Sequence, residues 1–296
     1  MSTMRLVLSI AACTVLGGCG SSEGPAAPAA TAAAPAATQR QQAPPPAPPA
    51  AEAAPPAVPI LEQQLAYGEA TRSNLVGYLA MPQDAAEPLP GIIVIHEWWG
   101  LNDEIKAMTR RLAAEGYVAL AVDLYGGKTA TTPDAAQGLL SEFYADPDAA
   151  RRNVQQAYDY LEKYAFAPRV ASIGWDLGGG WSLQTALLYP GALDAAVMYY
   201  GQVFTDSERL APLNVPLLGF FGGNDKSIPV RDVQEFRAKL LDLNKNAEIL
   251  IVPHADHAFA NPASPTYNAK AANESWASTL AFLERHLKLA TPTRPQ

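Results

Sequence analysis

Cysteine is nearly absent from this sequence. The 296 residues include only two cysteines, Cys13 and Cys19, and both lie within the first twenty positions. A disulfide framework and a metal site built from thiolates are therefore excluded for the rest of the chain. The sequence also lacks an H-E-x-x-H pattern, a Cys/His cluster and a nucleotide-binding loop, so we expect neither a metal ion nor another cofactor.

Positive charge is also scarce. Lysine and arginine number 21 against 29 aspartates and glutamates, which gives a formal net charge of -8. Nucleic acids are bound by basic surfaces, so a nucleic-acid partner is excluded. Hydrophobic residues make up 49% of the chain and can form a sizeable core. We therefore expect a monomer whose partner is a small-molecule substrate.

The N-terminus has the pattern of a targeting segment. Arg5 precedes an apolar run from Leu6 to Leu16, which is too short to span a membrane but suits a secretory signal. Leu16-Gly-Gly-Cys19 then resembles the lipobox of bacterial lipoproteins. The resemblance implies that residues 1–18 are a signal peptide and that Cys19 is lipidated, so that acyl chains alone hold the protein to a membrane. The alternative is an ordinary cleaved signal with an incidental cysteine.

The residues after Cys19 extend this prediction. Ser21 lies two places after the cysteine and no aspartate follows it directly, which by analogy with Gram-negative lipoproteins indicates the outer membrane, facing the periplasm. Residues 19–58 are rich in alanine and proline and predict a disordered tether. Residues 59–289 are predicted to form the folded domain, and residues 290–296 a flexible tail.

Apolar runs and helical patterns alternate along the folded part. Gly91 to His96 is a continuous apolar, β-branched run, which is typical of a strand buried on both faces. We expect two short antiparallel strands near residues 65–68 and 74–80, and further buried strands at 117–122, 170–173, 195–199, 217–221 and 247–252. Helices are expected at 103–115, 149–164, 177–189, 230–243 and 268–286. This order predicts an α/β fold with a mostly parallel central sheet and helices on both faces.

Chemically suggestive residues follow three of the buried strands. Gly174-Trp-Asp176-Leu-Gly178 has the G-x-nucleophile-x-G spacing of an elbow between a strand and a helix. Asp225 follows the strand that ends near 221, and His257 follows the strand that ends near 252. The order elbow, acid, histidine is that of the α/β-hydrolase triad, and ligands of such sheets bind at the carboxyl ends of the strands.

Longer segments resemble the dienelactone hydrolase family of the α/β-hydrolase superfamily. The resemblance covers roughly residues 61 to 288, and its segments are Ile95-His-Glu97-Trp-Trp-Gly100-Leu-Asn102, Gly116-Tyr-Val-Ala-Leu-Ala-Val-Asp123-Leu-Tyr125, the Gly174 elbow, Gly223-Asn-Asp225 and His254-Ala-Asp-His257-Ala-Phe259. It implies that His257 is the base, that Asp225 orients it and that Glu97 contacts the resting nucleophile. It also implies that the amides of Trp98 and Leu177 form the oxyanion hole.

Two positions depart from the pattern of that family. Asp176 stands where the family has its nucleophilic cysteine, and Asn261 stands where an arginine that binds the substrate carboxylate is expected. The sequence therefore does not predict a small anionic lactone as the substrate. Asn261, Trp99 and Trp175 are still expected to line the substrate pocket, although core packing is an alternative role for each tryptophan.

An aspartate at the elbow leaves several functions open. We expect a hydrolase acting on a small ester, lactone or related electrophile, in which Asp176 is a nucleophile or positions a water for His257. Asp176 and Glu97 could share a proton, because two carboxylates in one pocket raise the pKa of one of them. The alternatives are a catalytically silent binding protein of the cell envelope and a dehalogenase or epoxide hydrolase with an aspartate nucleophile. Glu97 could also merely brace its loop.

Overall fold

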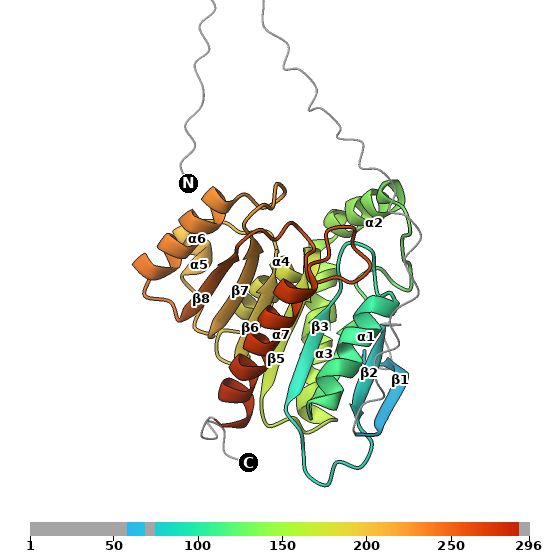
Figure 1. The fold of residues 1–296 in the computed structure, drawn as a ribbon. Coiled ribbons are helices and arrows are strands. Elements are labelled where there is room, and N and C mark those ends of the chain that lie inside the picture. The colour runs from blue at the N-terminus through green and yellow to red at the C-terminus, as the bar shows by residue number, and fades with distance from the viewer. Residues whose placement is uncertain (1–57, 69–74, 290–296) are drawn as a thin grey trace, which may run out of the picture. The chain divides into compact units, whose positions relative to one another are not determined.

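A computed structural model describes residues 58–68 and 75–289 of the chain (Figure 1). These residues belong to one unit of the chain, Gln41–Gln296. The signal peptide at 1–18, lipidation of Cys19, nearly all of the tether at 19–58 and the tail at 290–296 lie outside the described residues. Within the described ranges, no helix is both long enough and apolar enough to cross a membrane.

The described residues form a single eight-stranded sheet. Its strands lie in the order β1-β2-β4-β3-β5-β6-β7-β8. The pairs β1–β2 and β2–β4 are antiparallel, and every other neighbouring pair is parallel. The strands are β1 (Ile60–Ala66), β2 (Val76–Pro82), β3 (Gly91–Ile95), β4 (Val118–Val122), β5 (Val170–Trp175), β6 (Ala195–Tyr199), β7 (Leu217–Gly222) and β8 (Ala247–Val252).

The central strands are apolar without interruption because both of their faces are covered. Every residue of β3 and β4 is buried. Successive side chains of a strand point to opposite faces, and the two hydrophobic clusters of the protein follow this alternation. Ile93 and Ile95 belong to one cluster, whereas Ile92 and Val94 belong to the other.

Helices cover both faces of the sheet, as the sequence predicts (Figure 1). Buried residues of α1 and α7 belong to the cluster on one face, and buried residues of α2, α3, α4 and α6 belong to the cluster on the other. The helices are α1 (Asp103–Ala114), α2 (Pro133–Ala145), α3 (Pro147–Lys163), α4 (Leu177–Leu188), the short α5 (Ser207–Leu210), α6 (Val230–Asp242) and α7 (Ala269–Leu283), which continues into the π-helical turn η1 (Glu284–Lys288). The α/β-hydrolase fold expected from the sequence is confirmed.

Four helical segments differ from the sequence prediction. The helices α2 and α5 are not predicted by it, and α3 begins at Pro147 where the pattern predicts a start at Ala149. The side chain of Asp146 accepts a hydrogen bond from the amide of Ala149, and Pro147 suits the first helical position. At the other end of the chain, the α-helix stops at Leu283 and a π-helical turn follows it.

The parallel arrangement determines where the functional side chains meet. The strands β3, β5, β7 and β8 are parallel to their neighbours, so their carboxyl ends lie along the same edge of the sheet. In Figure 1, the loops after β3 and β8 lie at the top of the molecule. The residues that follow these strands are therefore neighbours in space although they are far apart in the sequence.

Candidate active site

The structure brings Asp176, Asp225 and His257 together at this edge. Nδ1 of His257 lies 2.8 Å from Oδ2 of Asp225, and Nε2 lies 3.2 Å from Oδ1 of Asp176. The imidazole therefore lies between two carboxylates, and each of its ring nitrogens faces one of them. About a quarter of each of the His257 and Asp176 side chains, 27%, is exposed, so solvent or a ligand can reach this pair.

The backbone holds Asp176 in a conformation that exposes its side chain. Asp176 has φ 52° and ψ -114° and directly precedes α4, as expected for the sharp turn of a nucleophile elbow. Two neighbouring glycines make the turn possible. A Cβ atom on Gly174 would lie 2.1 Å from the carbonyl oxygen of Gly178, and one on Gly178 would lie 2.2 Å from the carbonyl oxygen of Ile95. A side chain at either position would push β5, α4 and the end of β3 apart.

One of the two predicted oxyanion-hole amides contacts Asp176 itself. The amide of Trp98 donates to Oδ2 of Asp176 at 3.2 Å. Leu177 is the first residue of α4, and no hydrogen bond joins its amide to the Asp176 carboxylate in the described part of the chain. The two oxygens of Asp176 therefore have separate partners, the Trp98 amide for Oδ2 and the His257 ring for Oδ1.

Asp225 is held rigidly by its own loop. Its side chain is completely buried, and Oδ1 accepts hydrogen bonds from the amides of Ser227 at 2.7 Å and Ile228 at 2.9 Å. The other oxygen, Oδ2, is thereby directed at His257. A carboxylate fixed in this way determines which ring nitrogen of the histidine faces it.

The two carboxylates determine the charge of the imidazole. Burial lowers the pKa of His257, but hydrogen bonds to Asp176 and Asp225 and the charges of both carboxylates outweigh it and raise the pKa to about 10. The resting site at neutral pH therefore contains an imidazolium between two carboxylates. The proton on Nε2 faces Asp176, where it can be transferred to a nearby oxygen.

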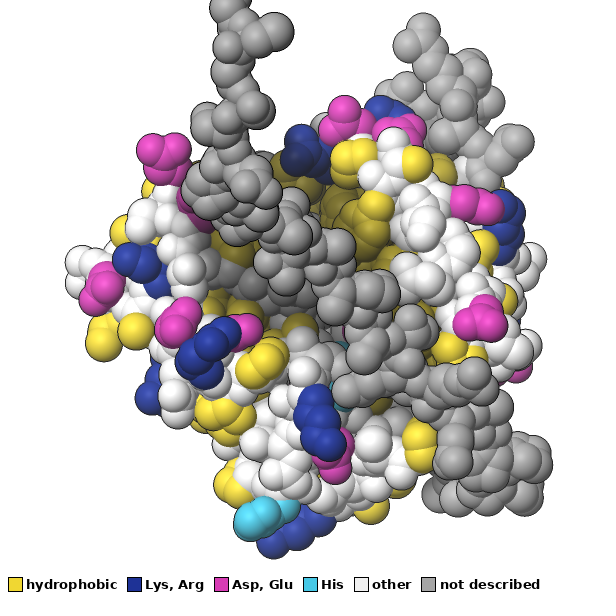
Figure 2. Space-filling view, turned by 90° about the horizontal axis from the view of Figure 1, so that it is seen from above, with side chains coloured by type: hydrophobic (Ala, Val, Ile, Leu, Met, Phe, Trp, Pro, Cys, Tyr) yellow, Lys and Arg dark blue, Asp and Glu magenta, His cyan; other side chains and the backbone are white. Residues whose placement is uncertain are grey.

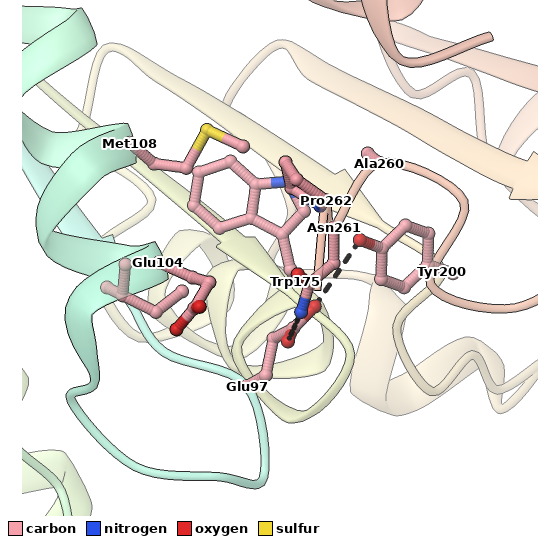
Figure 3. A pocket seen from close by; sticks show the side chains of 9 residues that line it. Glu97, Glu104, Met108, Trp175, Tyr200, Ala260, Asn261 and Pro262 are labelled. Atoms are coloured by element: carbon pink, nitrogen blue, oxygen red, sulfur yellow. Dashed lines mark hydrogen bonds between the residues drawn. The ribbon is translucent and has the colours of Figure 1, made fainter. Parts of the chain in front are cut away.

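Glu97 lies beneath the site in a small pocket of about 10 Å³ (Figure 3). Its Oε2 accepts a hydrogen bond from Nδ2 of Asn261 at 2.6 Å, and its Oε1 accepts one from the hydroxyl of Tyr200 at 3.4 Å. Burial, followed by the charge of Asp176, raises the pKa of Glu97 to about 7, although both hydrogen bonds act in the opposite direction. Glu97 is therefore divided between its neutral and charged forms near neutral pH.

No hydrogen bond joins Glu97 to Asp176 in the described part of the chain. Each oxygen of both carboxylates has another hydrogen-bond partner. The two groups instead influence each other through their charges. Asn261, which the sequence places in the substrate pocket, is buried against Glu97 and uses its Oδ1 to accept the amide of Ala263 at 2.8 Å.

Comparisons with known proteins agree with this fold. The chain matches the model of the "Dienelactone hydrolase family" over residues 75–287. The chain belongs to the dienelactone hydrolase family. It is 32% identical over 232 residues to a protein of Escherichia coli (strain K12) named "Putative carboxymethylenebutenolidase", an alignment that covers 72% of this chain and 83% of that protein.

Solved structures of the dienelactone hydrolase family have the same fold. The structure described as "Putative Dienelactone Hydrolase" from Klebsiella pneumoniae superposes with a TM-score of 0.67 at 29% identity and covers 77% of this chain and 99% of its own. A "Dienelactone Hydrolase-like" promiscuous phosphotriesterase from metagenomic libraries has a TM-score of 0.69 at 25% identity, and covers 77% of this chain and 98% of its own. The chain therefore contains nearly the full length of these hydrolase domains.

The remaining predicted residues of the dienelactone hydrolase site occupy different surroundings. Trp99 is half-buried, and its ring lies 4.7 Å from that of Trp98, whose amide contacts Asp176. Trp175 is only 2% exposed, stacks on Tyr199 at 5.6 Å and lines the small pocket of Glu97 (Figure 3). Trp99 is thus partly accessible, whereas Trp175 is part of the packing around Glu97.

Sequence reasoning missed the partners that hold this site. Tyr200, at φ 37°, donates to Glu97 from the end of β6 and packs edge-on against the His257 ring at 5.2 Å. His96 is fully buried, and burial lowers its pKa. Its Nε2 accepts the amide of Leu124 at 3.1 Å, so its Nδ1 carries the proton and donates to the carbonyl oxygen of Glu97 at 2.6 Å. His96 thereby joins the loops after β3 and β4.

Metal ligands do not gather around this constellation. Within the ranges 58–68 and 75–289, no group of three or more histidine, cysteine, aspartate or glutamate side chains could hold a metal ion.

A Glu97→Gln variant is expected to lose part of the pH dependence of folding. The folded pKa of Glu97, about 7, lies above its ordinary value of 4.5, so its contribution to stability is present below pH 4.5 and is lost as the pH rises through 7. The free energy of unfolding of the variant should therefore rise relative to that of the parent by about 3 kcal/mol between pH 4.5 and pH 8. Urea unfolding of the parent and the variant at pH 4.5 and at pH 8 measures this change. Glu104→Gln, which changes a second side chain of the same pocket, is the control. If the stability of Glu97→Gln and that of the parent depend on pH in the same way, the raised pKa of Glu97 is contradicted.

Proposed function

We propose that this protein is a hydrolase that acts on a small uncharged ester, lactone or related electrophile. In this proposal Asp176 is the nucleophile, His257 transfers protons, Asp225 orients His257 and Glu97 supports the pocket. The observation that supports it most directly is that the two oxygens of the Asp176 carboxylate have different partners. One carboxylate oxygen faces the proton of His257 and the other lies on the Trp98 amide.

The first step forms a covalent bond to the enzyme. Oδ1 of Asp176 attacks the electrophilic carbon of the substrate, and the bond from that carbon to the leaving oxygen breaks with its electron pair. The leaving oxygen takes the proton from Nε2 of His257. Attack at an sp³ carbon gives an ester on Asp176, and attack at an acyl carbon gives a mixed anhydride. In both cases the imidazole becomes neutral.

The second step consumes water. Covalent modification removes the charge of Asp176, which is one of the two groups that raise the pKa of His257, so the neutral imidazole can accept a proton from water. The hydroxide oxygen attacks Cγ of Asp176, and the Trp98 amide stabilises the negative charge that develops on Oδ2. The bond from Cγ to the former Oδ1 then breaks, and this oxygen departs on the substrate-derived group with the second proton of the water, which restores the carboxylate and the imidazolium.

The charge of the site favours an uncharged substrate. In the described part of the chain, no lysine or arginine forms an ion pair with Asp176, Asp225 or Glu97. Asn261, an uncharged amide, contacts Glu97 where the resemblance to the family leads one to expect an arginine. Figure 2 views the molecule from above and shows hydrophobic side chains gathered in a hollow on that face. The imidazolium of His257 offsets only one of the carboxylates around it, so an anionic substrate would still meet net repulsion.

Turnover in H₂¹⁸O tests the covalent route. Water that attacks Cγ leaves one of its oxygens in the carboxylate, so the peptide containing Asp176 should gain about 2 Da after several turnovers of p-nitrophenyl acetate or γ-butyrolactone. The peptide containing Asp225 is the internal control and should keep its mass. Hydrolysis without label in Asp176 would show that water does not attack Cγ and would overturn the proposed second step.

A second candidate is a catalytically silent binding protein. The specific observation that favours it is that Asp176 itself contacts the Trp98 amide and the His257 ring, the two groups that a substrate oxygen would use. An Asp176→Cys variant separates the two candidates. Esterase activity in the variant combined with none in the parent would support a silent parent, whereas turnover by the parent supports the hydrolase.

A further inference from the structure

A groove runs along one face of α3 and has a volume of about 430 Å³. The end of β1 forms its other wall, with Ala66, Tyr67 and Gly68. The residues that line it from α3 and the position after it include Gln155, Gln156, Asp159, Tyr160, Lys163 and Tyr164. Their spacing of three and four residues places these side chains on the same face of the helix. With Arg152, which also lines it, the groove follows about 18 Å of helix.

Two tyrosine rings form an aromatic surface in this groove. Tyr160 and Tyr164 are one helical turn apart, and their rings stack at 5.6 Å with an angle of 26° between the planes. Tyr160 is half-buried, whereas 71% of Tyr164 is exposed. A tyrosine ring in this position offers a flat apolar face together with a polar hydroxyl, which suits a ligand that has both apolar rings and hydrogen-bond acceptors.

The charged side chains of the groove are paired. Lys163 lies 3.2 Å from Asp159, and Arg152 lies 3.3 Å from Asp146. The groove therefore suits an uncharged ligand better than an ion. The side-chain amides of Gln155 and Gln156 also line it, and each has two N–H groups that can donate to a carbonyl oxygen.

The chain itself contains a segment with the matching chemistry. Pro44-Pro-Pro-Ala-Pro-Pro49 belongs to the tether and lies outside the described residues. It carries no charge, and its five prolines present carbonyl acceptors without N–H donors. Proline-rich segments favour the polyproline II conformation, in which six residues extend over about 19 Å, close to the length of the groove. Grooves lined by aromatic side chains are the usual binding sites for such segments.

The topology of the sheet brings the attachment point of the tether to the correct end of the groove. β1 is antiparallel to β2, which is antiparallel to β4, so β1 begins at the same edge as the parallel strands. α3 ends at this edge because it leads into β5, and Tyr160 and Tyr164 lie at that end of the helix. Residues 50–59 can extend over about 30 Å, which allows the proline segment to return to the groove.

We propose that the α3 groove binds residues 44–49 of the same chain, with proline rings against Tyr160 and Tyr164 and with Gln155 donating to a backbone carbonyl. Attachment to β1 gives the segment a local concentration of the order of 1 mM, so even weak intrinsic affinity is sufficient. The contact would limit the freely extending tether to residues 19–43. It does not depend on the proposed hydrolase function, and loss of catalysis leaves it unaffected.

Fluorine NMR of the full-length protein labelled with 3-fluorotyrosine tests this contact. Tyr160→Phe and Tyr164→Phe assign the two signals. Replacement of the five prolines of the segment by serine is expected to shift both signals, because the proline rings leave the tyrosine faces. A synthetic peptide of residues 41–58, added to this serine variant, should move the signals back toward their positions in the parent, with a Kd of about 1 mM.

Matched variants distinguish the groove from non-specific binding. In the serine variant, Tyr164→Ala should weaken the peptide about tenfold, followed at Tyr160, whereas Tyr267→Ala should leave its affinity within about twofold. Tyr267 is 40% exposed and does not line the groove. A peptide with serine in place of the five prolines should not bind. Identical signals of Tyr160 and Tyr164 in the parent and the serine variant would overturn the proposal, as would equal weakening by Tyr164→Ala and Tyr267→Ala.

Discussion

Replacement of Asp176 by asparagine is expected to lower kcat/KM for an activated ester or lactone by at least about four orders of magnitude. The amide of asparagine is a poor nucleophile and cannot accept the proton that Nε2 of His257 donates. The contact between Trp98 and Oδ2 can persist through the side-chain oxygen, so the elbow should keep its shape. Single-turnover and steady-state kinetics with p-nitrophenyl acetate measure the loss.

Asp256→Asn is the matched control for this substitution. It makes the same chemical change next to His257 in the sequence, at a residue without a contact to the triad in the described structure. Its kcat/KM should stay within about twofold of the parent, as for most surface changes away from the chemistry. Turnover of Asp176→Asn at the rate of the parent, with Asp256→Asn also unchanged, would remove Asp176 from the mechanism.

Asp225→Asn is expected to lower kcat by about 10⁴ with a smaller effect on KM. Oδ2 of Asp225 accepts the proton on Nδ1 of His257, and an asparagine that presents its amide nitrogen there would favour the wrong tautomer. The same change removes one of the charges that raise the pKa of His257. The alkaline limit of the residual activity should therefore shift to a lower pH than in the parent.

A pH–rate profile of the Asp225→Asn variant from pH 5 to pH 11 checks both effects. Asp232→Asn, which changes an exposed aspartate that pairs with Arg231 on α6, is the control and should reproduce the parent profile. If Asp225→Asn lowers kcat but leaves the alkaline limit in place, then His257 is not the group that sets that limit.

The sequence predicts the central sheet well because burial on both faces leaves a simple pattern. β3 and β4 are continuous apolar runs, and the loops that follow β5, β7 and β8 carry Asp176, Asp225 and His257. α2 was missed although Thr132 caps it and Pro133 occupies its first turn. Only Ala136 and Phe143 of its side chains are buried, so the apolar periodicity that marks an amphipathic helix is weak there.

The hydrogen-bond partners of Glu97 were harder to predict. Glu97 and Tyr200 are 103 residues apart, and Asn261 reaches Glu97 from a loop after β8. Nothing local in the sequence indicates these pairs, because the choice of partner depends on which loops the sheet brings together.

The shape of the elbow does not depend on the side chain at its centre. The turn at residue 176 is set by Gly174, Gly178 and the carbonyl oxygens they approach, and none of these contacts involves the side chain at 176. The side chain at this one position can therefore change while the scaffold and the pair of Asp225 and His257 are retained. The family to which this chain belongs should accordingly be divided by reaction type according to that single side chain and not by overall similarity.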